Sequence, residues 1–386
     1  MRFKTIYLDN GSTTMMDPIV LEAMKPFFTK RYANASSSHN FGQEAKLALE
    51  EARKTIAKSI NAKTNEIFFT SGGTESNNWA LKGLAFANKE KNHIITTKIE
   101  HKSILNSCKW LEKQGCNFTY LNVDKKGFVN LKELEEKITS KTLLISVMQA
   151  NNEIGTINNL KEIGSLCQSN KIYFHTDACQ SFTKTELDVK KCNLHLASLN
   201  SHKIHGPKGV GALYIKEGTK IEPLLHGGGQ ERLARAGTEN IHGIIGFAKA
   251  VEIAINKKHI IKMMKLRERL INNILKISNT KLNGPREEKR LCNNTNFSFK
   301  GIDGNLLGNY LYQKCICSST GSACSAKSSA PSYVLKAIGL SDEEAKSAVR
   351  LTLSRFTTED EIDYTLQILP KLIKKLRKGS FINKIF

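Results

Sequence analysis

Short apolar runs alternate with longer polar segments through the middle of the chain, and this alternation constrains the fold more than any other feature of the sequence. Six of these runs have the length and the β-branched and aromatic content of buried strands: residues 67–70, 94–97, 118–121, 143–148, 172–175 and 194–199. The segments between them are long enough for helices. Apolar strands separated by helices form a mainly parallel sheet with helices on both faces, so we expect an α/β fold.

Glycine and polar residues follow these runs, at the edge of the sheet where parallel α/β folds bind ligands. Ser71-Gly72-Gly73-Thr74 follows the first run and is typical of a phosphate-binding turn, because glycine permits a tight bend and a helix start exposes free N–H groups. An ordinary glycine turn has the same pattern. His101 follows the second run, where a histidine can stack on an aromatic ring and exchange protons, although a single histidine is more often structural.

Later runs are followed by further groups with useful chemistry. Asn152 follows the fourth run, and Asp177 follows the fifth, where a carboxylate can keep a pyridine nitrogen protonated and make the ring an electron sink. Ser201-His202-Lys203 follows the sixth run. A lysine amine can hold an aldehyde as a Schiff base when burial or nearby charge lowers its pKa. Each residue alone is ordinary, but together they predict a site for pyridoxal 5'-phosphate.

The composition excludes several classes of protein. A chain of 386 residues with 40% hydrophobic content can bury more than one core, so we expect two domains. The sequence contains no run of about 18 apolar residues, the length needed to cross a membrane. Residues 1–5 lead into a strand-like segment rather than the apolar core of a signal peptide. Nine scattered cysteines without repeated CxxC spacing argue against a disulfide framework. We expect a soluble, cytoplasmic protein with reduced thiols and no membrane partner.

The formal charge of +22 raises the question of nucleic-acid binding, because a basic stripe is the footprint of phosphate contacts. The basic residues are instead spread along the chain, and no nucleic-acid-binding motif accompanies them. A lysine-rich composition explains this charge, so we expect no nucleic-acid partner. The basic segment at residues 371–378 is amphipathic and fits a solvated helix.

The pattern changes after residue 258. A long helical segment is followed by strand-like residues 294–299, by shorter helical segments and by strand-like residues 349–353, which is typical of an α+β domain. We expect a large domain at residues 14–258 and a small domain formed by residues 1–13 and 259–386. The serine, glycine and alanine residues at about 318–330 predict a mobile loop in the small domain.

Two long motifs identify a family resemblance. Residues 7–14 (Tyr-Leu-Asp-Asn-Gly-Ser-Thr-Thr) and residues 350–359, together with the strand-end residues above, resemble cysteine desulfurases of the NifS/IscS type, within the class-V aminotransferases. The resemblance covers nearly the whole chain and implies a fold-type I transferase dependent on pyridoxal phosphate. The chain departs from the family pattern at Ala35, where proline is usual, and at Gly11-Ser12, which replaces a commoner pair of small apolar residues.

The resemblance implies a role for each matching residue of the cofactor site. Lys203 would hold the cofactor as a Schiff base and take a proton from the substrate, Asp177 would pair with the pyridine nitrogen, and His101 would stack on the ring and shuttle protons. Gln180 and Asn152 would contact the phenolic oxygen. The phosphate would be held by five residues, the last of them from the second subunit of a homodimer: Gly73, Thr74, Ser201, His202 and Thr238.

Arg350 and Cys324 would complete the chemistry that the resemblance implies. Arg350 would bind the substrate carboxylate in a bidentate fork, with Asn152 beside it. Cys324 would take sulfur from L-cysteine as a persulfide, leave L-alanine, and pass the sulfur to an acceptor protein such as an iron–sulfur cluster scaffold. Cys324 could also be a transient cluster ligand shared with that scaffold. A metal site with Cys315 and Cys317 would lack a fourth ligand and have unusual spacing.

Two related activities share much of this site. A selenocysteine lyase would use most of the same residues, whereas a class-V aminotransferase would need no Cys324 and would consume a keto acid. We favour the desulfurase because the chain combines Lys203, Asp177, Cys324 and Arg350. Cys179 adds an unexpected thiol next to Asp177, and we interpret it as a small buried residue.

Overall fold

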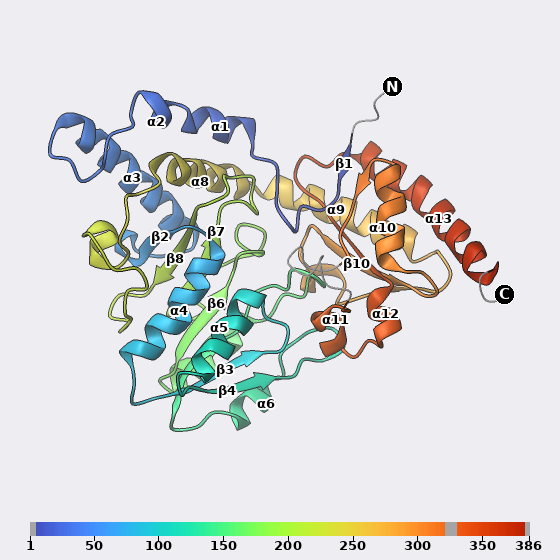
Figure 1. Cartoon of the computed structure of the whole chain (residues 1–386), viewed down its shortest axis with the longest axis horizontal. Helices are drawn as coiled ribbons and strands as arrows, with labels where there is room; N and C mark the ends of the chain where they lie inside the picture. Colours follow the sequence, from blue (N-terminus) through green and yellow to red (C-terminus); the bar gives the residue numbers. More distant parts are fainter. Residues whose placement is uncertain (1–4, 321–329, 383–386) are drawn as a thin grey trace.

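The structure is a computed structural model that describes residues 5–320 and 330–382. Cys324 and most of the loop predicted at residues 318–330 lie outside the described residues. Two groups of helices and strands lie side by side (Figure 1), a larger one built mainly from the first two thirds of the chain and a smaller one built mainly from the last third.

A seven-stranded sheet forms the centre of the larger group, with strand order β2-β8-β7-β6-β5-β3-β4. Its strands are β2 (Ile67–Thr70), β3 (His93–Thr97), β4 (Asn117–Leu121), β5 (Thr142–Ser146), β6 (Tyr173–Asp177), β7 (Leu196–Asn200) and β8 (Gly211–Ile215). Neighbouring strands are parallel except where β8 lies antiparallel to β2 and β7. The predicted α/β fold with a mainly parallel sheet is therefore confirmed.

The ends of the strands differ slightly from the sequence prediction. The first six strands begin and end within about two residues of the predicted runs, and β6 extends far enough to include Asp177 itself. Strand β8 was not predicted, because it begins at Gly211 within a glycine-rich segment that has the composition of a loop.

Helices cover both faces of this sheet because alternate side chains of each strand point to opposite faces. Ile95, Ile145 and Phe174 belong to one buried cluster, which includes residues of α3, α7 and α8. Their neighbours Ile94 and Leu144 belong to another, with residues of α4 and α5. The helices around the sheet are α1 (Pro18–Met24), α2 (Pro26–Thr29), α3 (Asn40–Ser59), α4 (Gly73–Ala87), α5 (Lys102–Glu112), α6 (Leu131–Glu136), α7 (Leu160–Ser169) and α8 (Ile241–Ala254).

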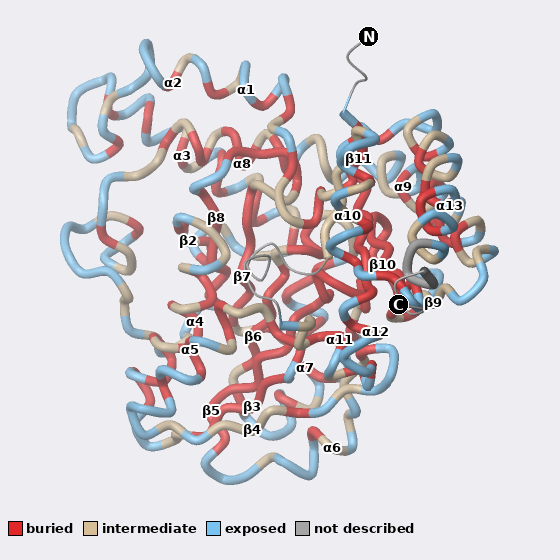
Figure 2. The backbone as a smooth tube through the Cα atoms, turned by 45° about the vertical axis from the view of Figure 1, so that its right-hand side comes forward, coloured by how far each residue is buried: buried red, intermediate tan, exposed pale blue. Residues whose placement is uncertain are grey.

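The smaller group contains a three-stranded antiparallel sheet with order β12-β10-β9. Its strands are β9 (Thr280–Leu282), β10 (Asn294–Phe299) and β12 (Ala348–Thr352), and its helices are α9 (Lys257–Ile274), α10 (Gly304–Gln313), α11 (Tyr333–Ala337), α12 (Asp342–Lys346) and α13 (Glu359–Ile382). The buried residues of this sheet and of α9, α10 and α13 form a core separate from that of the large sheet. Figure 2 shows the two buried regions and the exposed helix surfaces around them.

The N-terminal residues pack with the smaller group. Strand β1 (Ile6–Tyr7) pairs in parallel with β11 (Ile316–Cys317), and Ile6 and Leu8 belong to the smaller group's core. We retain the division into a large domain at residues 14–258 and a small domain at residues 1–13 and 259–386 as a proposal, which the separate cores support.

Residues 8–14 cross from one group to the other. The Leu8 carbonyl accepts a hydrogen bond from the main chain of Thr352 in β12, at 2.7 Å. At the other end of this segment, the N–H of Thr14 donates to the carbonyl of His202, next to Lys203, at 3.0 Å. This crossing segment therefore lies between the ends of β7 and β12, where functional residues were expected.

The described residues contain no membrane-spanning candidate: no helix among them combines the length and the apolar content that a bilayer requires.

Candidate active site

The structure brings most of the predicted site residues together around one cavity of about 220 Å³ at the carboxyl ends of the large sheet's strands. The predicted residues that line it are Gly73, Thr74, His101, Asn152, Asp177, Gln180, His202, Lys203 and Arg350. Ser201 is buried beside the cavity without lining it, and Thr238 is exposed and does not line the cavity of its own chain. Cys324 is outside the described residues.

The phosphate-type turn leads directly into α4. Helix α4 begins at Gly73, and no side chain of the described residues caps its N-terminus, so the first N–H groups can bind an anion. Gly72 has a φ of 149°, a backbone angle that residues other than glycine rarely adopt. A Cβ on Gly73 would collide with the Sγ of Cys179, so glycine is required there by close approach. The turn predicted from the sequence therefore has the geometry of an anion site.

Asp177 is held by a residue that the sequence analysis did not single out. The amide of Asn77 donates to Asp177 Oδ2 at 2.7 Å, and the main-chain N–H of Cys179 donates to Oδ1 at 2.9 Å. The Asn77 amide also donates to the hydroxyl of Ser103, at 2.8 Å. Asn77 lies one helical turn after Thr74 on α4, so that spacing from the phosphate-type turn is the signal that would have found it.

Lys203 has the properties expected of an amine that reacts near neutral pH. Burial, followed by the nearby charge of Arg350, lowers the pKa of Lys203 to about 8. Its Nζ donates to the carbonyl oxygens of Gly11 and Ser12, each at 2.5 Å. The amide of Gln180 donates to the same Gly11 carbonyl at 2.8 Å. The crossing segment therefore holds both side chains in place.

The two histidines of the site differ in their surroundings. Burial and the charge of Lys203 lower the pKa of His202 to about 3, so this ring is neutral at physiological pH. His101 is the N-cap of α5, and its Nδ1 accepts a hydrogen bond from the main-chain N–H of Ser103 at 3.2 Å. A neutral His101 therefore carries its proton on Nε2, the nitrogen available for exchange with a ligand.

A buried carboxyl group lies next to His101 in the sequence. Glu100 Oε1 accepts hydrogen bonds from the main-chain N–H of Met148 at 2.9 Å and from the hydroxyl of Thr97 at 2.8 Å, whereas Oε2 has no partner in the part of the chain that the structure describes. Burial raises the pKa of Glu100 to about 8, with a smaller contribution from Asp177. Glu100 is therefore mostly protonated at neutral pH and adds little charge behind the cavity.

Arg350 extends from β12 toward the cavity and is almost completely buried. Its Nη2 donates to Asp9 Oδ1 and to the hydroxyl of Ser12, both at 2.9 Å, and Nη1 donates to the Asn152 carbonyl at 2.9 Å. The Nε of Arg350 and the Oδ1 of Asn152 have no partner among the described residues. A free Nε–H on a buried guanidinium suits an incoming carboxylate.

Unsatisfied buried polar atoms indicate that this cavity is built for a polar ligand. Native proteins pair nearly all buried polar atoms, yet several atoms around this cavity lack a partner within the described residues: Asn77 Oδ1, Asn152 Oδ1, Asn200 Oδ1, Ser201 Oγ and Arg350 Nε. A free helix start, a carboxylate, an amine and a stacking histidine match the phosphate, ring nitrogen, aldehyde and ring face of pyridoxal phosphate. The residues present therefore fit this cofactor.

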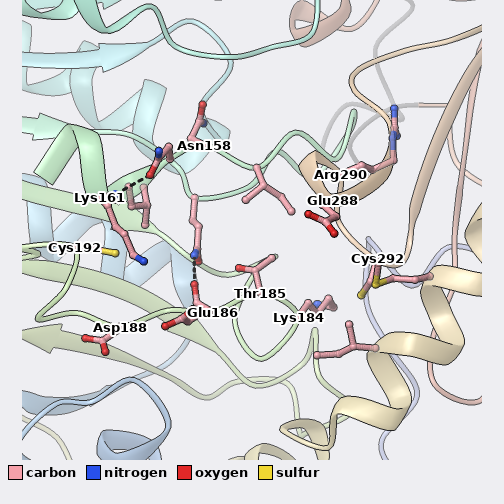
Figure 3. A pocket seen from close by; sticks show the side chains of 16 residues that line it. Asn158, Lys161, Lys184, Thr185, Glu186, Asp188, Cys192, Glu288, Arg290 and Cys292 are labelled. Carbon is pink, nitrogen blue, oxygen red and sulfur yellow. Dashed lines mark hydrogen bonds between the residues drawn. The ribbon is translucent and has the colours of Figure 1, made fainter.

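A larger cavity, of about 640 Å³, is lined by none of the predicted site residues (Figure 3). The amine of Lys184 lines it and donates to the Gln180 carbonyl at 2.9 Å. Burial lowers the pKa of Lys184 to about 8. This second cavity lacks a phosphate-type turn and a ring-stacking histidine, so the smaller cavity is the better cofactor site.

The eight cysteines of residues 5–320 and 330–382 are free thiols. Burial raises the pKa of most of them, including Cys108, Cys167, Cys179 and Cys292. Among the same residues, no group of three or more histidine, cysteine or acidic side chains could hold a metal ion. Cys315 lies just before β11 and Cys317 lies within it, and no third ligand among the described residues joins them.

Comparison with known proteins gives a consistent result. The aminotransferase class-V family model matches residues 6–365. Cysteine desulfurase IscS of Clostridium botulinum strain Hall is 52% identical over 382 residues, which cover 98% of this chain and 96% of that protein. A solved NifS-like protein superposes with a TM-score of 0.91 at 39% identity, covering 96% of this chain and all of the other. A structure described as SspA in complex with cysteine superposes with a TM-score of 0.81 at 37% sequence identity. The match covers 92% of this chain and 100% of the other.

Replacing Gly73 with alanine is expected to weaken cofactor binding by at least about tenfold, because the added methyl group collides with Cys179 at the start of α4. The change is measured as cofactor retained after gel filtration, read from visible absorbance. The single variant Cys179→Ala should keep its cofactor, and the double variant Gly73→Ala/Cys179→Ala should recover most of the loss. Full retention by Gly73→Ala, or no recovery in the double variant, contradicts this close approach.

Replacing Glu100 with glutamine is expected to change how stability depends on pH. Because the folded state raises the pKa of Glu100 from 4.5 to about 8, its protonated form stabilises the fold fully below pH 4.5, and this contribution is lost as the pH rises through 8. In wild type the free energy of unfolding should decline over this pH range, and Glu100→Gln should remove up to roughly 4–5 kcal/mol of that decline. Urea unfolding from pH 5 to pH 9 measures it. The exposed Glu135→Gln is the control, and parallel pH profiles for wild type and Glu100→Gln would refute the assignment.

Proposed function

The chain belongs to the class-V aminotransferase family, and from this we propose that it is a cysteine desulfurase, which uses pyridoxal 5'-phosphate to remove sulfur from L-cysteine and form L-alanine. The observation that carries this proposal is the joining, in one cavity, of a buried amine (Lys203), a supported carboxylate (Asp177) and a guanidinium with a free Nε–H (Arg350). These groups match an aldehyde cofactor and an amino-acid substrate.

The cofactor would supply an electron sink that stabilises negative charge on the substrate carbon. Gly73, Thr74 and the free N–H groups of α4 would hold its phosphate, with Ser201 and His202 beside them. Asp177, fixed by Asn77, would face the ring nitrogen, and His101 would stack on the ring. Gln180 and Asn152 would contact the phenolic oxygen. All of these residues line or border the same cavity. Thr238, which would come from a second subunit, is the exception.

Lys203 and His101 would move the protons of the reaction. The lowered pKa of Lys203 leaves a useful fraction of neutral amine at pH 7 to 8, so it can both hold the cofactor aldehyde and accept a proton from the substrate. His101 would carry a proton on Nε2 and exchange it with the substrate sulfur or with the carbon atom that the sulfur leaves. The neutral state of His202 avoids a further positive charge beside Lys203.

Cys324 would accept the sulfur as a persulfide. The chain enters the segment that carries Cys324 next to the proposed carboxylate site, because Ser319 pairs with Arg350 in an antiparallel bridge, with N–O distances of 3.1 and 2.6 Å. Arg350 and Asn152 would anchor the substrate carboxylate and so set the direction of the sulfur atom. A reductant or an acceptor protein would then take the sulfur from Cys324.

We further propose a homodimer located in the cytoplasm, with sulfur passing to an acceptor such as an iron–sulfur cluster scaffold, whose cluster Cys324 could briefly ligate. Thr238 would complete the phosphate site of the neighbouring subunit, which accounts for its exposed position away from the cavity of its own chain. The first three helices expose several large apolar side chains, which a partner subunit could cover: Ile19, Leu21, Phe28, Phe41 and Leu47.

Replacing Cys324 with alanine is expected to reduce sulfide release from L-cysteine by at least about a hundredfold, because the reaction loses its sulfur-accepting thiolate. The visible absorbance of the bound cofactor should not change. Alanine and sulfide are assayed together with a thiol reductant, and wild type should yield equal amounts. Cys317→Ala is the matched control. Wild-type sulfide production by Cys324→Ala would remove Cys324 from the mechanism.

Mixing two inactive variants tests whether Thr238 acts across subunits. In a mixed dimer of Lys203→Ala and Thr238→Ala, one site carries both changes and the other carries neither, if Thr238 serves the neighbouring subunit. Refolding an equimolar mixture should then restore activity in up to about a quarter of all sites, because half of the dimers are mixed and each has one intact site. Activity that stays at the average of the two separate variants would place Thr238 in its own subunit's site.

A further inference from the structure

Arg350 does not hold its orientation alone. Its side chain is buried, and its Nη2 contacts two oxygen atoms of the crossing segment, Asp9 Oδ1 and Ser12 Oγ, each at 2.9 Å. The Ser12 hydroxyl donates to the same Asp9 oxygen at 2.7 Å. These three side chains therefore form a closed ring of hydrogen bonds in which the serine accepts from the arginine and donates to the aspartate.

The guanidinium geometry explains what this ring achieves. A carboxylate binds most strongly to two neighbouring N–H groups in one plane, and the Nε and Nη2 edge is such a pair. Nε has no partner within the described residues, and Nη2 is the nitrogen that Asp9 and Ser12 contact. Nη1 is bound to the Asn152 carbonyl. The contacts at Nη2 and Nη1 fix the plane of the guanidinium and leave Nε–H for a ligand.

Ser12 also touches the amine of the site. Its carbonyl accepts a hydrogen bond from Lys203 Nζ at 2.5 Å, while its hydroxyl contacts Arg350. A single residue therefore contacts both the group proposed to meet the substrate's amino end and the group proposed to meet its carboxylate. In an α-amino acid these two ends are attached to one carbon atom, so their separation in the site must be set closely.

We propose that Ser12 is a positioning residue that selects α-amino acids, by fixing the Arg350 guanidinium relative to Lys203 through its hydroxyl. This inference rests on the proposed function and adds a specificity residue to it. An alanine at this position would keep the carbonyl contact with Lys203 but lose both hydroxyl contacts. Asp9 and Arg350 would then remain paired without the bridge, and the guanidinium plane would be less restricted.

The selection acts on the carboxylate of the ligand. An amine without a carboxylate gains nothing from the orientation of Arg350, whereas an amino acid does. Removing the serine hydroxyl should therefore weaken the binding of amino acids and leave the binding of simple amines unchanged. A general loss of structure would weaken both ligands equally, so the pair of ligands separates a positioning role from a merely structural one.

The test uses the cofactor-loaded enzyme and a spectral titration with two probes, L-alanine and ethylamine, which differ by the carboxylate. Ser12→Ala is expected to weaken L-alanine binding roughly three- to tenfold, which is the range for loss of a hydrogen bond to a charged group. Its affinity for ethylamine should stay within about twofold of that of wild type. Ser12→Thr, which keeps the hydroxyl, should bind L-alanine within about twofold of wild type. Ser165→Ala, on the exposed face of α7, is the matched control.

Steady-state kinetics give a second readout. For Ser12→Ala the KM for L-cysteine should rise by the same roughly three- to tenfold factor while kcat stays within about twofold, because the hydroxyl contacts neither the thiol nor the proton-transfer groups. Equal L-alanine affinity in wild type and Ser12→Ala, or equal weakening of both probes, overturns the inference. If wild type responds to L-alanine but releases no sulfide from L-cysteine, the proposed function fails and the role of Ser12 does not.

Discussion

The crossing segment at residues 8–14 joins two cores that otherwise pack separately, and the geometry of the site depends on this junction. Lys203 lies after β7 of the large sheet, whereas Arg350 lies in β12 of the small one. Ser12 contacts both side chains, because its carbonyl accepts a hydrogen bond from Lys203, as that of Gly11 does, and its hydroxyl accepts one from Arg350. A substrate that bridges amine and guanidinium would therefore depend on hydrogen bonds made by this short segment of the chain.

Burial gives the site its protonation states. The same low-dielectric surroundings lower the pKa of Lys203 and His202 and raise that of Glu100. A neutral histidine and a protonated glutamic acid keep the cavity free of charges that would compete with the ion pair of Arg350 and Asp9. The amine can lose its proton near physiological pH without a dedicated base beside it. Burial thus sets the protonation of the Lys203 amine and of its neighbours.

The sequence predicted the large sheet and most of the site because both follow from local patterns. Apolar runs mark the strands, and parallel strands bring Gly73, His101, Asp177 and Lys203 to one edge. The supporting contacts could not be predicted in this way, because their partners are distant in the chain: Asn77 and Asp177 are separated by 100 residues, and Asp9 and Arg350 by 341. Strand β8 was not predicted because its glycine-rich start has the composition of a loop.

The buried thiols have a consequence for the fate of the sulfur atom. A cysteine accepts the outer sulfur of a persulfide as its thiolate, and protonated thiols are poor acceptors. Cys108, Cys167 and Cys292 stay protonated at neutral pH because burial raises the pKa of each. Sulfur held by this protein would therefore not scramble onto these structural cysteines. A chain rich in cysteine can in this way carry reactive sulfur without becoming its own acceptor.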